Sequence, residues 1–175
     1  PAESPYGYTK QMGEQIINEF AKSTGTQCIL LRYFNPVGAH SSIHIGEMPI
    51  GRPQNLVPAI TQTAIGTLPK MMVYGNDYDT RDGSCIRDFV HVSDVVGANL
   101  LALNDEKLNG TVLNVGTQQS FTIFDIAQII IDKLRSPLRP EIVGKARVGD
   151  IRHCMADISR IHSLSGYCPA VSFDK

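Results

Sequence analysis

The chain alternates between segments with helical hydrophobic spacing and short apolar runs typical of buried strands. Apolar residues recur at helical spacing from Ser4 to Ser23. Pro5 suits the first turn of a helix and Gly25 suits its C-terminal cap, so this segment is predicted to be helical. The next run, residues 28–34, is continuous, apolar and bounded by turn residues, which predicts a strand buried on both faces of a parallel sheet. A helix followed by a buried strand is typical of α/β proteins.

The rest of the chain repeats this pattern. Strands are predicted at residues 71–74, 89–92, 111–115 and 141–143, and helices at 56–65, after 92, at 122–134 and after 157. Ser93 and Asp157 are expected to cap two of these helices, and Thr122 and Asp125 have the spacing of a capping box.

Two loops interrupt the regular elements. Residues 35–53 and 75–84 are rich in glycine, proline and polar residues, and the first loop is longer than most connections in compact domains. Loops of this kind are usually functional or disordered. Asp77, Asp79 and Asp82 in the second loop lack the spacing of an EF-hand, so no metal site is predicted.

Composition excludes several classes of function. The 175 residues include 16 Lys and Arg against 17 Asp and Glu, a net charge of −1 that gives no footprint for nucleic acid or an anionic membrane surface. The mainly apolar stretches are far shorter than the roughly 20 residues that span a bilayer. The four cysteines have no paired C-x-x-C spacing, so neither a zinc site nor a disulfide framework is indicated. We expect a soluble protein of the cytoplasm.

A candidate for acid/base chemistry lies in the first predicted helix. Tyr6 and Lys10 are four residues apart, so their side chains point the same way. A nearby cation favours the phenolate and lowers a phenol pKa that is about 10 when unperturbed, which makes tyrosine a usable base. The same spacing also arises by chance on solvated helices, and alone it favours that reading.

An ordered series of motifs changes this weighting. The motifs lie at 6–10, 31–38, 46–47, 53–58, 73–78, 87–94, 114–117 and 147–150. Together they cover essentially the whole chain and resemble the nucleotide-sugar epimerase/dehydratase branch of the extended short-chain dehydrogenase/reductase superfamily. The series is far more specific than any one motif.

The resemblance implies a fold and a division into domains. It implies the C-terminal part of a Rossmann-type dinucleotide-binding domain followed by a small mixed α/β substrate-binding domain. Residues 1–35 would end the Rossmann-type domain, and residues 36–175 would mainly form the substrate domain, with 86–104 returning to the Rossmann-type domain.

The resemblance also implies NAD as cofactor and inversion at C4 of UDP-glucose and UDP-galactose through a transient 4-keto sugar. Tyr6 would take the proton from the sugar 4-hydroxyl. Lys10 would hold the nicotinamide ribose and depress the Tyr6 pKa, and Tyr33 would approach the nicotinamide side.

Substrate contacts follow from the same resemblance. They fall on Asn35, Asn55, Leu56, Tyr74, Arg87, Arg147, Asp150 and Cys154. The two arginines would clamp the diphosphate with their planar guanidinium groups, and Tyr74 would lie beside the uracil. The alternatives are surface ion pairs of the arginines with Asp88 or Asp150, and turn or helix-cap roles for the asparagines. The histidines are interpreted as structural.

Cys154 bears on the choice of sugar. The resemblance places this position on the wall of the sugar pocket, where a bulky tyrosine accompanies restriction to glucose and galactose. A small side chain leaves room for an N-acetyl group at C2, so activity on UDP-GlcNAc and UDP-GalNAc is a further hypothesis. The alternative is a buried cysteine that acts only as a small hydrophobic residue.

The chain departs from the family pattern in one respect. It contains no G-x-x-G-x-x-G or G-x-G-x-x-G sequence to seat a dinucleotide pyrophosphate. We therefore expect the C-terminal portion of an epimerase, inactive by itself and with weak or absent NAD binding. The alternatives are another nucleotide-sugar epimerase, a 4,6-dehydratase, and a noncatalytic UDP-sugar-binding product. The resemblance also implies a homodimer formed through the helix that carries Tyr6.

Overall fold

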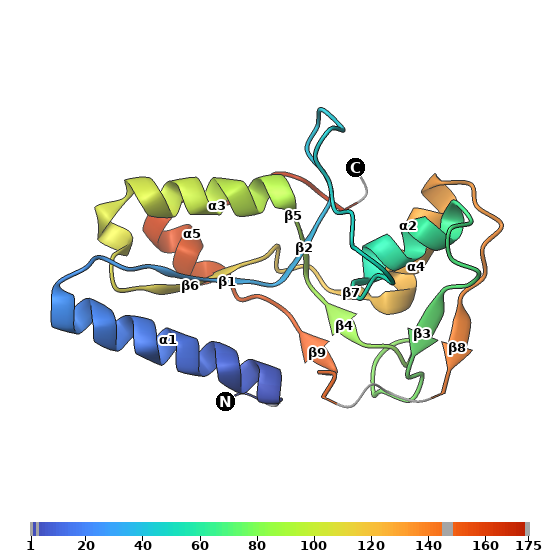
Figure 1. The fold of residues 1–175 in the computed structure, drawn as a ribbon, viewed down its shortest axis with the longest axis horizontal. Helices are drawn as coiled ribbons and strands as arrows, with labels where there is room; N and C mark the ends of the chain where they lie inside the picture. The colour runs from blue at the N-terminus through green and yellow to red at the C-terminus, as the bar shows by residue number, and fades with distance from the viewer. Residues whose placement is uncertain (1, 3, 145–148, 174–175) are drawn as a thin grey trace.

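The computed structural model describes residues 2, 4–144 and 149–173. Its α/β architecture, with mainly parallel strand pairs, confirms the predicted class, and Figure 1 shows an elongated molecule with a lobe at each end. The helices are α1 (Pro5–Thr24), α2 (Leu56–Ala64), α3 (Val92–Asn104), the 3-10 helix η1 (Glu106–Leu108), α4 (Ile123–Lys133) and α5 (Ser159–Ser165). The strands are β1 (Leu30–Tyr33), β2 (Asn35–Val37), β3 (Met72–Tyr74), β4 (Ile86–Arg87), β5 (Phe89–His91), β6 (Val112–Val115), β7 (Phe121–Thr122), β8 (Glu141–Val143) and β9 (His153–Cys154).

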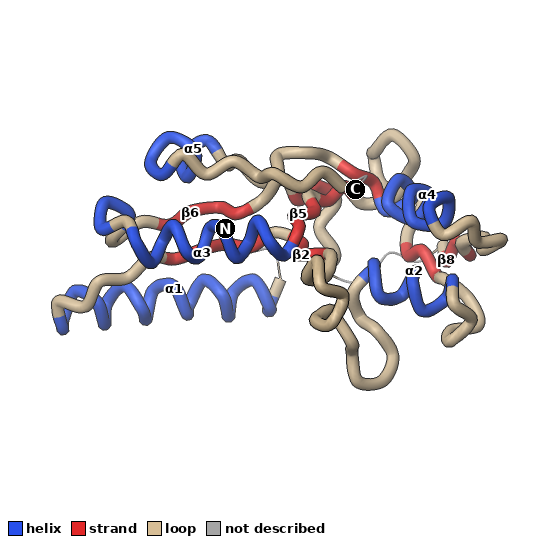
Figure 2. The backbone as a smooth tube through the Cα atoms, turned by 90° about the horizontal axis from the view of Figure 1, so that it is seen from above, coloured by secondary structure: helices blue, strands red, loops and turns tan. Residues whose placement is uncertain are grey.

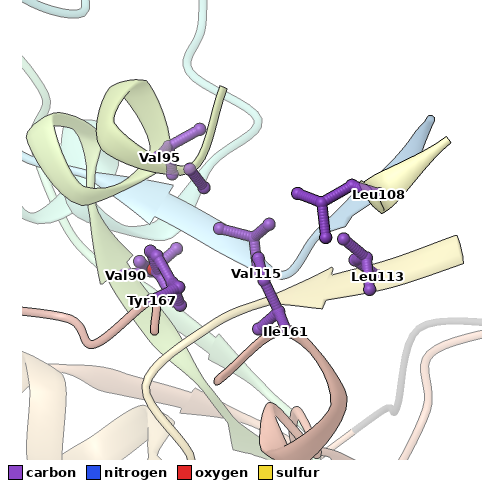
Figure 3. Close-up of a cluster of buried hydrophobic side chains, with 8 residues drawn as sticks. Val90, Val95, Leu108, Leu113, Val115, Ile161 and Tyr167 are labelled. Carbon is purple, nitrogen blue, oxygen red and sulfur yellow. The ribbon is translucent and has the colours of Figure 1, made fainter. Parts of the chain in front are cut away.

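The first lobe is built around the parallel pair β1 and β6. Leu30 lies opposite Val112, and α1 and α3 run along opposite sides of the pair (Figure 1). Side chains from α3, η1, β5, β6, α5 and the C-terminal segment form one hydrophobic cluster (Figure 3): Val90, Val95, Ala98, Leu108, Leu113, Val115, Ile161 and Tyr167. Residues from the middle and the end of the chain therefore share this core.

The second lobe lies at the other end of the molecule, where α2 and α4 pack beside the parallel pair β3 and β8 (Figure 2). Its cluster consists of Ile60, Met71, Val73, Phe89, Ile126, Ala127 and Ile131. Val90 of β5 belongs to the first cluster and Phe89 to the second. Strand β5 thus connects the two cores, because successive side chains of a strand point to opposite faces.

Short strands between the lobes bring distant segments together. Strand β2 runs parallel to β5, and β4 lies between antiparallel β7 and parallel β9. Asn35 is the register partner of Phe89, and Arg87 is the partner of Cys154. Only Asp88 separates β4 from β5. This arrangement places residues that are far apart in the sequence on neighbouring strands.

Several predicted helix ends are confirmed. Pro5 lies in the first turn of α1, and Gly25 ends the helix in the left-handed conformation. The cap at Ser4 was not predicted: its side chain accepts a hydrogen bond from the Gly7 N–H. The capping box of α4 is also present, because Thr122 and Asp125 each accept from the other's backbone N–H. Within the described residues, no helix has both the length and the apolar character needed to cross a bilayer.

Two predicted caps are wrong. Helix α3 is capped by His91, whose Nδ1 accepts from the Ser93 N–H at 3.2 Å, so Ser93 lies inside the helix. The N-cap of α5 is Ile158, one residue after the predicted Asp157. The Asp157 carboxylate nevertheless accepts from the Ser159 N–H at 2.9 Å, so it serves a donor of the first turn from one residue further out.

The predicted parallel strand within residues 28–34 is confirmed by β1, but its predicted burial on both faces is wrong. Strand β1 is shorter, and Arg32 and Tyr33 are exposed. Among the described strands only β6 pairs with it, and α1 buries none of its own residues. Asn35–Val37 is a strand although residues 35–53 were predicted to be irregular, and the two-residue strands β4, β7 and β9 were not predicted.

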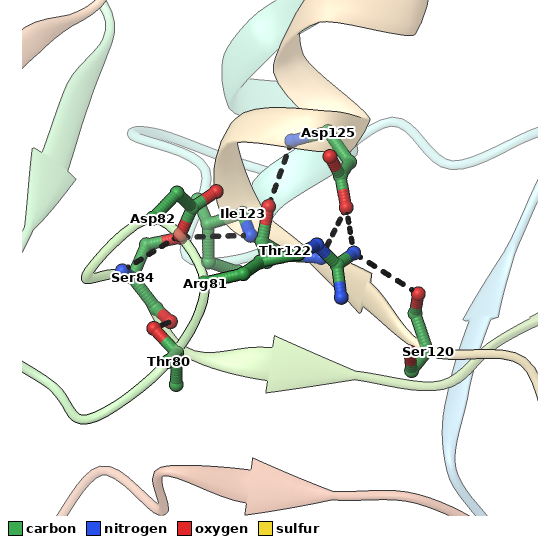
Figure 4. A network of polar contacts seen from close by, with 8 residues as sticks. All are labelled: Thr80, Arg81, Asp82, Ser84, Ser120, Thr122, Ile123 and Asp125. Carbon is green, nitrogen blue, oxygen red and sulfur yellow. Dashed lines mark hydrogen bonds and ion pairs between the residues drawn. The ribbon is translucent and has the colours of Figure 1, made fainter.

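The loop between β3 and β4 is fastened to the start of α4 (Figure 4). Arg81 forms an ion pair with Asp125 and donates to the Ser120 carbonyl oxygen, while the Ser84 hydroxyl accepts from the Ile123 N–H at 3.2 Å. Burial acts to raise the pKa of Asp125, but the Thr122 N–H and Arg81 outweigh it and hold that pKa below its ordinary value. The loop is therefore held against the second lobe by charge and hydrogen bonds.

Candidate active site

The first turns of α1 present the predicted acid/base pair. The Ser4 cap and Pro5 fix the start of the helix, and Tyr6 follows with 71% of its surface exposed. The Lys10 ammonium lies 5.2 Å from the centroid of the Tyr6 ring. The predicted shared face is confirmed, and the distance is within the range of a cation–π contact.

Three adjoining clefts connect this pair to the second lobe. The inner cleft, about 330 Å³, lies among the start of α2 and strands β2, β3 and β4. The middle cleft, about 530 Å³, shares Asn35, Arg87 and Asp150 with the inner one and extends to Tyr6. The outer cleft, about 1170 Å³, lies between α1 and β1 and shares Tyr6 and Tyr33 with the middle one.

The predicted site residues with described positions all line these clefts. The inner cleft is lined by Asn35, Asn55, Leu56, Tyr74, Arg87 and Asp150; the middle cleft adds Tyr6, Tyr33 and Cys154; and the outer cleft adds Lys10. Arg147 lies outside the described residues. The structure thus brings into one region side chains that are spread over most of the chain.

Arg87 stands where the inner and middle clefts meet. Its guanidinium forms an ion pair with Asp150 and donates to the carbonyl oxygens of Ile86 and Ile151. Only 13% of the Arg87 side chain and 30% of the Asp150 side chain are exposed, so this is a sheltered pair rather than a solvated one. Between the two partners considered from the sequence, Arg87 pairs with Asp150 and not with Asp88, whose carboxylate accepts backbone N–H groups instead.

The two asparagines are held by different contacts. Asn35 lies in β2, and its Nδ2 donates to the Asp88 carbonyl oxygen at 2.7 Å. Asn55 is the N-cap residue of α2, but its side chain makes no cap bond, and its Nδ2 donates to Glu47 at 2.6 Å. Because each amide nitrogen has a partner, the amide oxygens are left as candidate acceptors for a ligand.

Two aromatic side chains have sulfur or amide partners. The Tyr33 hydroxyl donates to the Asn99 Oδ1 at 2.8 Å, and the Tyr74 hydroxyl lies 3.8 Å from the Met72 sulfur. The phenol of Tyr33 is therefore anchored to α3 while its residue lines the middle and outer clefts.

Burial disfavours the thiolate form of the two cysteines that line the clefts. Burial raises the pKa of Cys154, and it also raises the pKa of Cys85, which lines the inner cleft. All four cysteines are free. Among the described residues, no group of three or more His, Cys, Asp or Glu side chains is placed to hold a metal ion.

Comparison with known proteins gives the family. Residues 1–116 match the NAD dependent epimerase/dehydratase family. The chain belongs to this family.

Individual relatives extend the match over nearly all of the 175 residues of this chain. The chain is 42% identical to the UDP-glucose 4-epimerase of Yersinia enterocolitica. The match covers 94% of this chain and 49% of that protein. The crystal structure of the UDP-glucose 4-epimerase of Stenotrophomonas maltophila, with bound NAD and formylated UDP-arabinopyranose, is 40% identical over 98% of the chain, with a TM-score of 0.88. The crystal structure of the UDP-glucose 4-epimerase of Bifidobacterium longum, in complex with NAD+ and UDP, is 34% identical over 99% of the chain, with a TM-score of 0.92. The chain spans about half the length of each of these relatives.

Sequence reasoning missed two features of this epimerase/dehydratase site. Glu47 lines the inner cleft and holds Asn55, although it comes from the long loop after β2. Asp88 is fully buried beside Arg87 and bonds to segments 29 to 68 residues away. The motif at 46–47 did not indicate what Glu47 contacts, and the sequence suggested only an ion pair with an arginine for Asp88, not the backbone N–H groups that it binds.

Proposed function

We propose that this protein is an NAD-dependent epimerase that interconverts UDP-glucose and UDP-galactose by inversion at C4. The proposal is supported by the family and by relatives that are UDP-glucose 4-epimerases. The observation that carries it is the continuity of the three clefts, which lead from Tyr74 and Asn55 past Arg87 to Tyr6 and Lys10. A nucleotide at one end of such a passage places its sugar beside the tyrosine.

The proposed nucleotide end is the inner cleft. Arg87 is the proposed partner of the diphosphate, because a guanidinium forms paired hydrogen bonds with phosphate oxygens. Leu56 and Tyr74 supply apolar and aromatic surface for the base, while Asn35 and Asn55 offer amide oxygens to hydroxyl groups. Asp150, already paired with Arg87, keeps the guanidinium oriented into the region shared by the inner and middle clefts.

The proposed reacting end lies at Tyr6. As the phenolate, Tyr6 would accept the proton of the sugar 4-hydroxyl, and as the phenol it would return the proton after the 4-keto sugar has turned over, while the Lys10 ammonium stabilises the phenolate. The hydroxyl and ammonium groups of Tyr6 and Lys10, on the wall of the large outer cleft, fit a ribose with its neighbouring hydroxyls. NAD, when bound there beside Tyr33, supplies the hydride acceptor and donor.

Binding can be tested with calorimetric titration of UDP-glucose into the purified 175-residue chain. We expect saturable binding that weakens by about tenfold or more in Arg87→Ala, the loss typical of a charged hydrogen-bonding partner. Arg160→Ala is the matched control, because Arg160 is exposed on α5, where its guanidinium donates to the Val112 carbonyl oxygen, and it lines none of the three clefts. Equal affinities for the two variants would contradict the proposal.

Catalysis requires a second test. The chain contains no Gly-rich dinucleotide-binding sequence, so we propose that by itself it binds NAD weakly and turns over little substrate. In a polypeptide that joins it to such a strand–helix unit, Tyr6→Phe should lower kcat by about 100-fold or more while UDP-glucose binding persists. Tyr8→Phe, on the same helix but outside the clefts, is the control and should leave kcat unchanged.

Cys154 is proposed to set the space around the sugar. It lines the middle cleft with Tyr6 and Asn35, and its small side chain leaves room for an N-acetyl group at C2. Cys154→Tyr in the joined polypeptide should lower turnover of UDP-GlcNAc much more than turnover of UDP-glucose. An unchanged ratio would remove Cys154 from the specificity argument. Cys168→Tyr at an exposed position is the control.

We also propose a homodimer formed through α1. Met12, Ile16, Ile17 and Phe20 are between 43% and 68% exposed, an apolar surface that association with a second copy would cover. Sedimentation of the chain should show concentration-dependent dimers that Ile16→Lys weakens.

The proposed division into domains places residues 1–35, which include α1, in the nucleotide-binding domain. Residues 36–175 would mainly form the substrate domain, with 86–104 returning to the nucleotide-binding domain.

The four free thiols support a reducing, cytoplasmic location. Labelling of Cys168 by a membrane-permeant thiol reagent in intact cells would test it, and a Cys168 found oxidised would contradict it.

A further inference from the structure

Asp88 has the surroundings of a buried carboxylate whose role is structural organisation. The residue is 0% exposed, although a charged side chain is seldom buried without strong partners. One carboxylate oxygen accepts from the Thr117 N–H at 2.8 Å and from the Thr117 hydroxyl at 2.7 Å. The other accepts from the N–H groups of Gln118 at 2.7 Å and Ala156 at 3.2 Å. These four bonds engage both carboxylate oxygens, and among the described residues no cationic side chain forms an ion pair with Asp88.

The backbone of the same residue holds two cleft residues. The Asp88 carbonyl oxygen accepts from Asn35 twice, from its backbone N–H at 3.2 Å and from its Nδ2 at 2.7 Å. The Asp88 N–H donates to the Cys154 carbonyl oxygen at 3.0 Å. Arg87 precedes Asp88 directly in the chain. Asn35, Arg87 and Cys154, which all line the middle cleft, are thus fixed relative to one another through this residue.

The atoms around the Asp88 carboxylate are closely packed. A Cβ at Gly116 would lie 2.5 Å from the Ala156 Cβ and 2.9 Å from the Asp88 Oδ2, so only glycine fits there. Gln118 has a φ of 61°, in the left-handed region that residues other than glycine rarely occupy, and its N–H donates to the carboxylate. The carboxylate therefore holds a tight turn after β6 as well as the segment after β9.

We propose that Asp88 is a positioning residue of the nucleotide-sugar cleft, which sets the spacing of Asn35, Arg87 and Cys154 by binding three backbone segments at once. This inference rests on the proposed function for its ligand. Asp88 touches no substrate itself. Asp88 would act on the ligand through Asn35 and Cys154, which its backbone binds, and through Arg87, which precedes it in the chain.

A matched variant separates positioning from stability. Asp94 is also a buried carboxylate, 8% exposed, that accepts two backbone N–H groups, from Ala170 and Val171 at 3.1 Å each, but it lines none of the three clefts. Both Asp88→Asn and Asp94→Asn replace an ionised acceptor by an amide, and both are expected to lower the midpoint of urea unfolding. Only Asp88→Asn should alter the cleft.

Two readouts at a temperature where all variants are folded test this difference. The first is hydrogen exchange of the Asn35 side-chain amide by nuclear magnetic resonance, which should quicken by about tenfold or more in Asp88→Asn and stay within about twofold in Asp94→Asn. The second is the dissociation constant for UDP-glucose, which should follow the same order. If wild type does not bind UDP-glucose, the proposed function fails, but Asn35 exchange still decides the role of Asp88.

Unchanged Asn35 exchange and affinity in a destabilised Asp88→Asn protein would overturn the inference. Equal changes in the two variants would overturn it as well, because they would reflect loosening of the whole fold. If Asp88→Asn does not fold, Thr117→Val removes the hydroxyl that donates to Asp88 and keeps the backbone donor; the same hydroxyl also donates to the Phe89 carbonyl oxygen and accepts from the Gln119 N–H. It should change the same two readouts in the same direction but by less, and no change in either would contradict the proposal.

Discussion

Helices α1 and α4 have the same kind of sequence pattern but very different surroundings. Helix α1 has 20 residues and buries none of them, while α4 has 11 and buries Ile126, Ala127 and Ile131. Both begin with a side-chain cap. The periodicity of a sequence shows where the apolar face of a helix lies, but it does not show which segments cover that face. For α4 the cover comes from α2, and for α1 none of the described segments provides it.

The largest expected difference between the two helices is the cost of truncating an apolar side chain. Ile126→Ala leaves a cavity in the second core and should lower the free energy of unfolding by about 2–5 kcal/mol. Ile16→Ala, at a side chain that is 68% exposed, should change it by less than about 0.5 kcal/mol. Urea unfolding followed by circular dichroism measures both, at a chain concentration at which sedimentation shows only monomers. Similar losses at the two positions would show that α1 is covered within the monomer, which would remove the apolar surface proposed for the dimer.

The next effect concerns the two caps. Thr122 is fully buried and belongs to the complete capping box, so Thr122→Ala should cost about 1–2 kcal/mol of unfolding free energy. Ser4→Ala removes a single bond to the Gly7 N–H at the end of an uncovered helix. Its cost should appear as local fraying, seen in faster amide exchange of the first turn, with little change in the global midpoint. A larger global loss from Ser4→Ala would reverse the comparison.

Sequence pattern identified the helices because their ends carry local signals. Gly25 and Thr122 act on neighbours three or four residues away, so their roles could be predicted from the sequence. Strands of two residues, such as β4 and β9, are too short to show any period and exist only through their pairing. The burial of β1 depended on segments beyond its own sequence, and the prediction that it is buried on both faces was wrong for that reason.

The features of the candidate site also divide into those that local sequence predicts and those that depend on contacts between distant segments. The shared face of Tyr6 and Lys10 follows from helical spacing, and their proximity is confirmed. The grouping of Asn35, Arg87 and Cys154 in one cleft needed a family resemblance, because strand pairing over long separations creates it. The partners of Asp88 are mostly backbone N–H groups, which carry no signature of residue type.

A third prediction concerns how the stability contributed by Asp125, in the first turn of α4, depends on pH. The pKa of Asp125 is lowered in the folded protein, so its contribution to stability is present above its unfolded pKa and is lost as pH falls through the folded value. That loss occurs below the ordinary value of 3.8. Asp125→Asn should therefore be less stable than wild type at neutral pH, with the difference shrinking toward pH 3. Thermal unfolding across this range measures it, and a constant difference would show that the charge is not responsible.

The smallest expected effect is the ion pair that ties α1 to β1. Arg32 binds both Glu14 carboxylate oxygens at 2.6 Å, and this hydrogen bonding holds the pKa of Glu14 below its ordinary value. The Arg32 side chain is 54% exposed, so Glu14→Gln should cost less than about 1 kcal/mol of global stability. Amide exchange along α1 should quicken, while exchange in α4 stays as in wild type. Quickening in both helices would mean that α1 supports the second lobe.

The separation of the Asp88 partners along the chain also has a consequence for synthesis on the ribosome. The buried members of the second core are complete once Ile131 has emerged, whereas the carboxylate of Asp88 must wait for Ala156. At about 5–20 residues per second, translation reaches Ala156 only seconds later. A nascent chain can thus bury this core before the cleft proposed for the nucleotide sugar is complete. The proposed ligand then cannot template the early steps of folding, and would stabilise only chains whose synthesis has passed this point.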